Sequence, residues 1–276
     1  MNFLQAILLG IVQGLTEFLP ISSSAHLVIV PYLLNWTFPE KQKFVFDVLV
    51  QVGTLLAVII FFWKDLISIM QAFFLGLWKK QPFTDAQSRL GWLLILATIP
   101  AGLIGLFLKE MVEAAFNSPV ATALSLYGTA ILLVAAEYFG HRTRSLEHIH
   151  WLDALWIGLA QAISIFPGIS RSGATITGGM LRQLDRPAAA RFSFLMSIPI
   201  MLAAGLLSTF DLVKIPGLSE FLPVLGLGFV TSAVVGYFSI RWLLSFLIRH
   251  SFKSFVIYCA SAATLVLLIA LIRSIG

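Results

Sequence analysis

Long apolar stretches separated by short polar segments dominate this chain. Six of the stretches are about 20 residues long and carry few or no charges, at 44–63, 90–108, 119–139, 190–209, 221–240 and 254–272. An α-helix needs about 20 apolar residues to cross the hydrocarbon core of a bilayer. The pattern therefore predicts six membrane-spanning helices.

Two further apolar regions are interrupted by polar residues. Residues 3–34 contain the break PISSS at 20–24, and residues 152–181 contain the break PGISRSG at 167–173. Each region is predicted to form two half-length helices that enter and leave by the same membrane face, as a re-entrant hairpin. Irregular backbone at membrane depth persists only inside protein or beside water. We therefore expect an all-α polytopic membrane protein of about six transmembrane helices plus two re-entrant helical hairpins.

The two interrupted regions resemble each other. QGLTEFLPISSS at 13–24 aligns with QAISIFPGISRS at 161–172, at an offset of 148 residues. Further along, Tyr127 matches Tyr258 and GLF at 105–107 matches GYF at 236–238, at an offset of 131. The pattern divides a single membrane domain, 1–276, into repeats at 1–139 and 151–272. Each repeat holds three spans, an odd number, so the second is expected to be inverted, with a site at the repeat interface.

Composition and charge support a membrane location. Hydrophobic residues make up 59% of the chain and charged residues 11%, against about 25% charged in soluble domains. A soluble globular protein is excluded. The net charge of +5 is typical of Lys- and Arg-rich cytoplasmic loops, so no nucleic-acid partner is expected.

The basic residues also predict orientation. With six spans and two hairpins, the basic residues divide unequally between the two sides of the membrane, and Arg171 lies in the second break. One side carries five of them. The other side carries 12, namely Lys64, Lys79, Lys80, Arg89, Arg142, Arg144, Arg182, Arg186, Arg191, Arg241, Arg249 and Lys253. The richer side should be cytoplasmic. Both termini, the mouth of the first hairpin and the loop at 109–119, which carries Lys109, are then expected outside, as is Lys214.

Three ionisable residues lie in or beside the breaks, namely Glu17, His26 and Arg171. A charge at the bilayer centre costs at least about 2.5 kcal/mol, so such residues are candidates for function. Glu17 and Arg171 occupy corresponding regions of the two repeats and would converge if the hairpins meet. A structural ion pair is the alternative interpretation.

The neighbouring residue types suggest phosphoryl transfer. A hydroxyl of Ser22, Ser23 or Ser24 is a nucleophile if a base, Glu17 or His26, takes its proton. On the second break, Arg171 has the geometry to bind phosphate oxygens bidentately. Serines before a helix are also common N-caps, which is the other interpretation of Ser22 and Ser24.

These motifs resemble the two signatures of the undecaprenyl-diphosphate phosphatases, the bacitracin-resistance family. The matching segments are QGLTEFLPISSSAHL at 13–27 and PGISRSGATITGGM at 167–180. The resemblance implies a multi-pass enzyme of the bacterial plasma (inner) membrane, with its site opening outward. The enzyme would convert undecaprenyl diphosphate into the monophosphate carrier of peptidoglycan synthesis.

The resemblance also implies roles for individual residues. Ser23 matches the proposed nucleophile, Glu17 the second acidic residue of the first motif and His26 the motif histidine. Arg171 matches the phosphate-binding arginine. Ser22, Ser170 and Ser172 would be further donors to the phosphate, and supporting roles are expected for Gln13, Gln161 and Gly173.

Two positions depart from the family pattern. Gln13 stands where the family often has Glu, and Ala25 where it often has Gly. A two-carboxylate metal site is therefore in doubt, although a divalent cation, Mg²⁺ or Ca²⁺, would still be able to bridge Glu17 and diphosphate oxygens.

Other readings stay open at this point. A transporter or flippase that moves a polyprenyl phosphate lipid without hydrolysis also fits inverted repeats. A phosphatidic-acid-phosphatase type of site is disfavoured, because Thr177 stands where that signature needs His. Covalent catalysis or direct water attack, and whether the chain forms a homo-oligomer among its membrane lipids, are not decided by the sequence.

Overall fold

The computed structural model describes residues 1–107, 118–212 and 218–275, and its regular elements there are helices. Six are long and apolar enough to cross a membrane: α3 (Glu40–Phe61), α5 (Ala86–Phe107), α7 (Pro119–Phe139), α10 (Arg186–Leu212), α11 (Leu218–Leu247) and α12 (Lys253–Ile275). The six predicted spans and the all-α polytopic fold class are confirmed. Most of the loop predicted at 109–119, with Lys109, and also Lys214, fall outside the described residues.

Each interrupted region forms two short helices. The first contains α1 (Phe3–Thr16) and α2 (Ser23–Leu33), and the second contains α8 (Trp151–Ile163) and α9 (Arg171–Leu181). At 1.5 Å per residue none of the four is long enough to cross a bilayer core alone. The breaks lie at 17–22 and 164–170, a few residues before the predicted positions, because Ser22 and Ser170 act as N-caps. The re-entrant course of these units stays a prediction.

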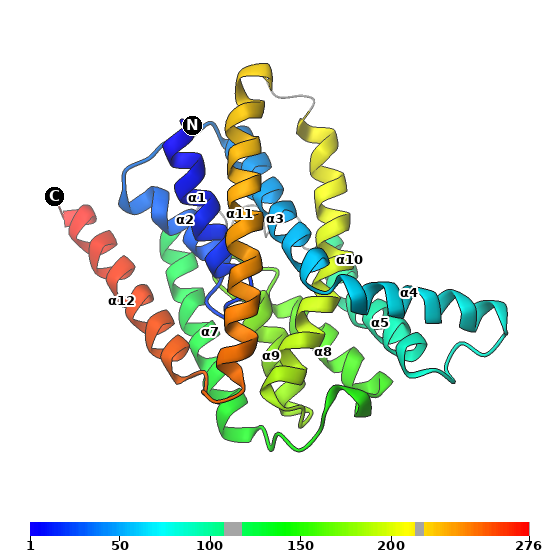
Figure 1. Cartoon of the computed structure of the whole chain (residues 1–276). Helices are drawn as coiled ribbons and strands as arrows, with labels where there is room; N and C mark the ends of the chain where they lie inside the picture. The colour runs from blue at the N-terminus through cyan, green and yellow to red at the C-terminus, as the bar shows by residue number, and fades with distance from the viewer. Residues whose placement is uncertain (108–117, 213–217, 276) are drawn as a thin grey trace.

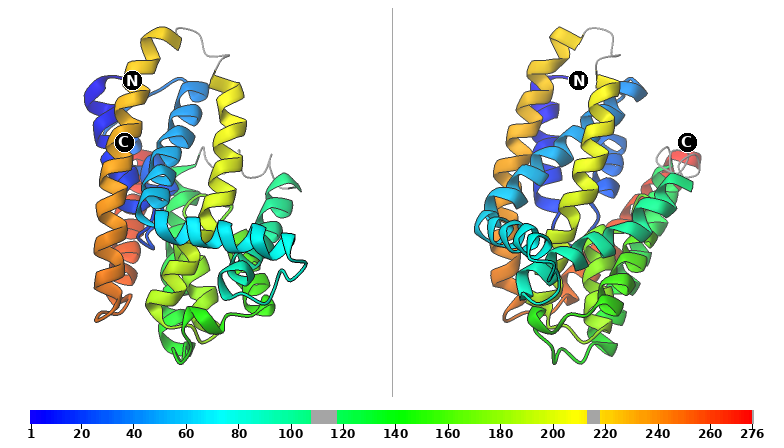
Figure 2. Two further views of the ribbon diagram at one scale, coloured as in Figure 1. Left: turned by 45° about the vertical axis from the view of Figure 1, so that its right-hand side comes forward. Right: turned by 90° about the vertical axis from the view of Figure 1, so that its right-hand side faces the viewer.

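Helices from the first half of the chain pack in pairs against helices from the second half (Figures 1 and 2). In the first interrupted region α1 packs against α11, and in the second α8 packs against α5. Helices α3 and α10 pack against each other, and α7 packs against α12. Both chain termini lie toward the end of the molecule where α11 begins, and α4 (Trp63–Trp78) runs across the other helices (Figure 1).

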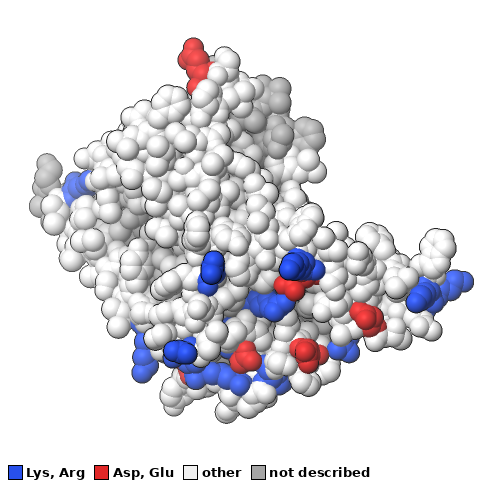
Figure 3. Space-filling view, viewed as in Figure 1, with Lys and Arg blue, Asp and Glu red and all other residues white. Residues whose placement is uncertain are grey.

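Ion pairs hold the opposite end together. Glu137 at the end of α7 accepts hydrogen bonds from Arg142 and Arg186, and buried Asp153 in α8 accepts from Arg144 and Arg182. On the face shown in Figure 3, Lys and Arg side chains gather in a band over the lower part of the molecule. A cavity of about 620 Å³ is lined in part by Glu137, Arg142 and Arg186, and one of about 730 Å³ is lined in part by Arg89 and Arg191. Neither cavity includes Glu17, Ser23 or Arg171.

Candidate active site

The first break carries Glu17 and Ser23 into the protein interior. Glu17 is the C-cap residue of α1 and is 7% exposed. The chain then turns at Pro20 and Ser22, and Ser23 opens α2. The Ser23 hydroxyl donates a hydrogen bond of 2.6 Å to Glu17 Oε2. A serine hydroxyl in contact with a carboxylate is the arrangement in which a base takes the proton of a nucleophile.

The second break is held in place by α7. Gly168 has φ of +99°, and a Cβ there would lie 2.3 Å from the Thr122 carbonyl oxygen, so this position requires glycine. The Thr129 hydroxyl donates to Gly168 O at 2.9 Å and accepts from Ser170 N at 2.8 Å. These bonds fix the turn from which Arg171 begins α9.

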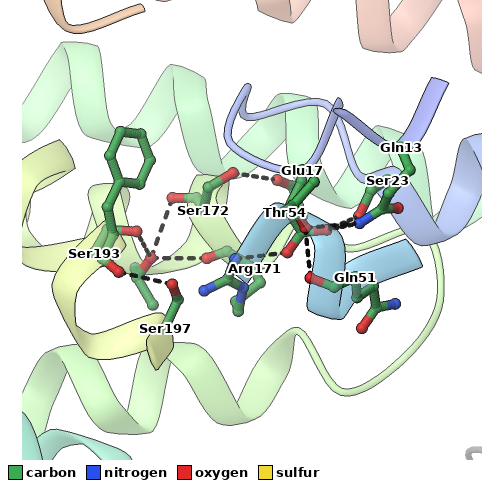
Figure 4. Close-up of polar contacts among 12 residues, drawn as sticks. Gln13, Glu17, Ser23, Gln51, Thr54, Arg171, Ser172, Ser193 and Ser197 are labelled. Atoms are coloured by element: carbon green, nitrogen blue, oxygen red, sulfur yellow. Dashed lines mark hydrogen bonds and ion pairs between the residues drawn. The ribbon is translucent and has the colours of Figure 1, made fainter. Parts of the chain in front are cut away.

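The two breaks meet through Glu17 and Arg171, as their positions in the sequence suggested (Figure 4). Arg171 Nη2 donates to Glu17 Oε1 at 2.7 Å, and the Glu17 and Arg171 side chains are 6% and 17% exposed. The Ser172 hydroxyl also donates to the Leu19 carbonyl at 3.1 Å. Residues about 150 positions apart in the sequence thus form one buried polar cluster.

Gln13 and Thr54 complete the surroundings of Glu17. The Gln13 amide donates to Glu17 Oε2 at 2.7 Å and to Thr54 Oγ1 at 3.3 Å, and Thr54 donates to the Gln51 carbonyl at 2.7 Å. Sequence reasoning missed Thr54, because a single hydroxyl within an apolar span gives no distinguishing signal.

The beginnings of α2 and α9 both lie at this cluster. The third backbone N–H group of each helix, that of Ala25 in α2 and of Gly173 in α9, donates a hydrogen bond to a serine side chain. No hydrogen bond is described for the first two backbone N–H groups of either helix, which belong to Ser23, Ser24, Arg171 and Ser172. Free N–H groups and the positive end of the helix dipole make a helix N-terminus an anion site. Two such termini beside one arginine favour a ligand with several negative oxygens.

Several predicted phosphate-binding residues are used for capping in this structure. Ser22 Oγ accepts from Ala25 N and contacts Ser24 Oγ at 3.2 Å, while Ser170 Oγ accepts from Gly173 N and contacts Ser172 Oγ at 3.1 Å. The alternative interpretation of Ser22 as an N-cap is therefore confirmed, whereas Ser24 lies inside α2 and is not its N-cap. Ser170 caps α9 in the same way as Ser22 caps α2. Ser23 differs from these serines because its hydroxyl is bonded to the carboxylate.

His26 does not contact Ser23 through either ring nitrogen. Its Nδ1 lies 2.7 Å from the Ser22 carbonyl oxygen, and its Nε2 lies 2.7 Å from the hydroxyl of Tyr258 in α12. These contacts give no support to His26 as the base that takes the proton of the Ser23 hydroxyl. Tyr258 was noted in the sequence only as the repeat partner of Tyr127.

Gln161, assigned a supporting role, lies in α8 and is 2% exposed. Neither side-chain polar atom of Gln161 has a hydrogen-bond partner among the described residues. It contributes no described contact to the cluster around Glu17.

The residues present do not form a resident metal site. Glu17 is the one carboxylate of the cluster, and its oxygens accept from Arg171, Ser23 and the amide of Gln13. Gln13 turns its amide N–H, a donor, toward that carboxylate. Within the described ranges no group of three His, Cys, Asp or Glu side chains is placed to hold a metal ion.

Known proteins resemble this chain over nearly its whole length. The family model described as "Bacitracin resistance protein BacA" matches residues 6–265. The undecaprenyl-diphosphatase of Thermomicrobium roseum is 43% identical over 276 residues, covering 98% of this chain and 98% of the relative. The undecaprenyl-diphosphatase of Chlorobium phaeovibrioides is 45% identical, covering 98% of this chain and 97% of the relative. That of Desulforudis audaxviator is 44% identical and covers 99% of this chain and all of the relative. The chain therefore belongs to the bacitracin resistance protein BacA family.

Proposed function

We propose that this protein is a membrane phosphatase that hydrolyses undecaprenyl diphosphate to undecaprenyl phosphate and inorganic phosphate. Recycling of this lipid carrier supplies peptidoglycan synthesis and confers resistance to bacitracin. The observation that carries the proposal is the position of Glu17, which bonds both Ser23 and Arg171 between two helix N-termini. Family membership and the names of the full-length relatives support the substrate.

Arg171 and the two helix N-termini are proposed to bind the diphosphate. Only Nη2 of the guanidinium has a described hydrogen bond, the one to Glu17. Of the five N–H donors of the guanidinium, this bond uses one, so Nη2 keeps a second N–H that, together with that of a neighbouring guanidinium nitrogen, matches two phosphate oxygens in one plane. The free N–H groups of Ser23, Ser24 and Ser172 face the same anion. These fixed donors stabilise negative charge on the phosphoryl oxygens in the transition state.

Ser23 is the proposed nucleophile and Glu17 its base. The Ser23 oxygen forms a bond to the terminal phosphorus while its proton passes to Glu17 Oε2, 2.6 Å away. The bond from that phosphorus to the bridging oxygen breaks, and the lipid monophosphate departs. Water then cleaves the phosphoserine, which releases inorganic phosphate and restores the serine hydroxyl. In the alternative scheme Glu17 activates water directly and Ser23 only binds phosphate.

Departure of the lipid monophosphate does not require a proton from His26. A phosphate monoester dianion is a good leaving group, because its second pKa is about 6. Both ring nitrogens of His26 have other partners. The chemistry therefore needs Ser23, Glu17 and Arg171, with His26 in a role that does not involve contact with the phosphate.

The proposed setting is the bacterial plasma membrane, with both termini outside and the site open to the outer face. The distribution of basic residues supports this orientation. The family implies the same direction, because wall synthesis outside the membrane releases the carrier lipid as the diphosphate that is to be recycled.

Phosphate release from a C55 diphosphate by the purified protein in detergent tests the function. Wild type should release one phosphate per lipid, and Glu17→Gln should lose almost all activity. Glu220→Gln, at an exposed carboxylate in the first turn of α11, is the matched control and should match wild type. A protein that only moves the lipid across the membrane would release no phosphate in this assay.

A further inference from the structure

His26 is fixed at both ring nitrogens. The Ser22 carbonyl can only accept, so Nδ1 carries the proton, and in the neutral ring Nε2 accepts from the Tyr258 hydroxyl. The two rings are also stacked, with centroids 5.6 Å apart and planes inclined by 13°. The Ser22 carbonyl thereby sets the tautomer of the imidazole, and Tyr258 holds the orientation of the ring from its other side.

The carbonyl that His26 holds belongs to a strained residue. Ser22 has φ of 68° and ψ of 96°, in a region that residues other than glycine rarely adopt, and it is 3% exposed. Its carbonyl accepts from His26 N at 3.3 Å and from His26 Nδ1 at 2.7 Å. The residue that follows is Ser23, so the conformation of Ser22 decides where the Ser23 hydroxyl lies relative to Glu17.

The two tyrosines that match in the repeats make different contacts. The Tyr127 hydroxyl in α7 bonds Thr264 Oγ1 in α12 at 2.7 Å, which joins two spanning helices away from Glu17. The Tyr258 hydroxyl reaches across from α12 to α2 instead. Other hydrogen bonds also join α12 to the first interrupted region. The Cys259 thiol lies 3.8 Å from Pro20 O, and Arg273 donates to Tyr32 O at 2.8 Å and to Leu33 O at 3.4 Å. Of these contacts, the one from Tyr258 is made to His26, which holds the Ser22 carbonyl.

We infer that Tyr258 is a positioning residue for the reaction, acting through His26 and the Ser22 carbonyl to hold the Ser23 hydroxyl against Glu17. The chain of contacts runs from α12 to the beginning of α2 without touching the substrate. The inference rests on the proposed phosphatase function, and it assigns His26 to alignment of the nucleophile and not to proton transfer. A misplacement of a reacting group by about 1 Å can cost roughly 100-fold in rate.

The test compares Tyr258→Phe with Tyr127→Phe by phosphate release. Tyr258 is 44% exposed, so loss of its hydroxyl leaves no cavity in the core. We expect Tyr258→Phe to lower kcat about tenfold, the equivalent of one hydrogen bond, with KM within about twofold because Arg171 is untouched. Tyr127→Phe loses one hydroxyl bond of the same length and should keep kcat within about twofold of wild type.

A double-mutant cycle separates positioning through His26 from a general structural effect. In a His26→Ala background, Tyr258→Phe should cause no further loss. The inference is overturned if Tyr258→Phe matches wild type, or if it lowers the activity of His26→Ala by the same factor as that of wild type.

Conservative replacements of His26 provide an independent test of the role of its contact with the Ser22 carbonyl. Asparagine places an amide near the position of Nδ1 and can still donate to Ser22 O, whereas glutamine extends toward the position of Nε2. The inference expects His26→Asn to retain more activity than His26→Gln, and the opposite order overturns it. If wild type itself releases no phosphate, the proposed function fails. In that case ¹⁵N NMR of His26 tests the contact between His26 and Tyr258 alone. The imidazole should carry its proton on Nδ1, and its Nε2 signal should shift in Tyr258→Phe but not in Tyr127→Phe.

Discussion

Gly158 of α8 lies directly against the backbone of Ala97 in α5. A Cβ at Gly158 would be 2.3 Å from the Ala97 carbonyl oxygen, and a Cβ at Gly10 of α1 would be 2.8 Å from the carbonyl oxygen of Gly228 in α11. Gly158 follows Gly10 by 148 residues and Gly228 follows Ala97 by 131, the two offsets at which the repeats align. We propose that these crossings are equivalent contacts of an inverted repeat, in which small residues let backbones approach closely.

The first prediction tests this helix crossing. Gly158→Ala should lower the thermal midpoint in detergent, because overpacking costs about 1–3 kcal/mol and the nearest atom at Gly158 is backbone. Gly102→Ala in α5 is the control, since a Cβ there meets nothing within 4 Å. Alanine for an unhindered helical glycine should be neutral or stabilising by about 0.5–1 kcal/mol. Equal midpoints for the two variants would mean that the crossing is looser than described.

The second prediction concerns the three neighbouring serines. Ser23→Ala should abolish phosphate release if Ser23 is the nucleophile. Ser22→Ala and Ser24→Ala should be milder, because Ser22 caps α2 and neither contacts Glu17. Thermal melts of all three variants control for folding. If Ser23→Ala keeps about a tenth of wild-type activity, a loss of roughly 1.4 kcal/mol, direct attack by water replaces the covalent scheme.

The spans and the meeting of Glu17 with Arg171 were accessible from the sequence. Span length follows from bilayer thickness, and the breaks follow from Pro, Gly and Ser in otherwise apolar stretches. Glu17 and Arg171 stood out because a charge at membrane depth is costly without a partner. The ion pair of 2.7 Å between them is that partner.

The contacts of His26 and Ser22 were not accessible in the same way. Side chains in a helix point back toward its N-terminus, so His26 reaches the carbonyl four residues earlier, that of Ser22. Its other partner, Tyr258, is 232 residues away, and only the packing of α12 brings it there. A serine before a helix fits an N-cap and a substrate-binding residue equally well in the sequence, because only the fold shows which group its hydroxyl contacts.

The third prediction tests the role of Arg171. Arg171→Lys keeps the charge but loses the planar pair of donors. We expect kcat/KM for the C55 diphosphate to fall by the equivalent of about 2–4 kcal/mol. Arg249→Lys, at an exposed arginine next to the end of α11, should be unchanged. Near-normal turnover of Arg171→Lys would reduce Arg171 to a structural partner of Glu17.

The fourth prediction concerns Gln13 and metal ions. Gln13→Glu would place a second carboxylate beside Glu17, where the amide now donates at 2.7 Å. Two adjacent carboxylates repel each other unless a proton or a cation lies between them. Phosphate release by Gln13→Glu should therefore need less Mg²⁺ or Ca²⁺ for half-maximal activity than wild type, and EDTA should inhibit it more strongly. An unchanged metal dependence would show that position 13 does not face the cation, if one binds with the substrate.

The fifth prediction concerns orientation, which decides the face to which the site opens. The band of Lys and Arg is expected in the cytoplasm, which places Gln81, between α4 and α5, inside and Ser219, in the first turn of α11, outside. Both residues are exposed, and Ser219 lies at the end of the molecule where both termini lie. In a Cys259→Ala background, Ser219→Cys should react with a membrane-impermeant thiol reagent in intact cells.

Gln81→Cys should react only after the cells are opened. Labelling of both variants with a permeant reagent shows that each thiol is accessible. Removal of Cys259 should not disturb the measurement, because this thiol is buried and its one described bond, to Pro20 O, is long at 3.8 Å. Labelling of Gln81→Cys and not Ser219→Cys in intact cells would invert the orientation. The beginnings of α2 and α9 would then be reached from the cytoplasm, and the enzyme would act on lipid diphosphate made inside the cell instead of lipid returned from wall synthesis.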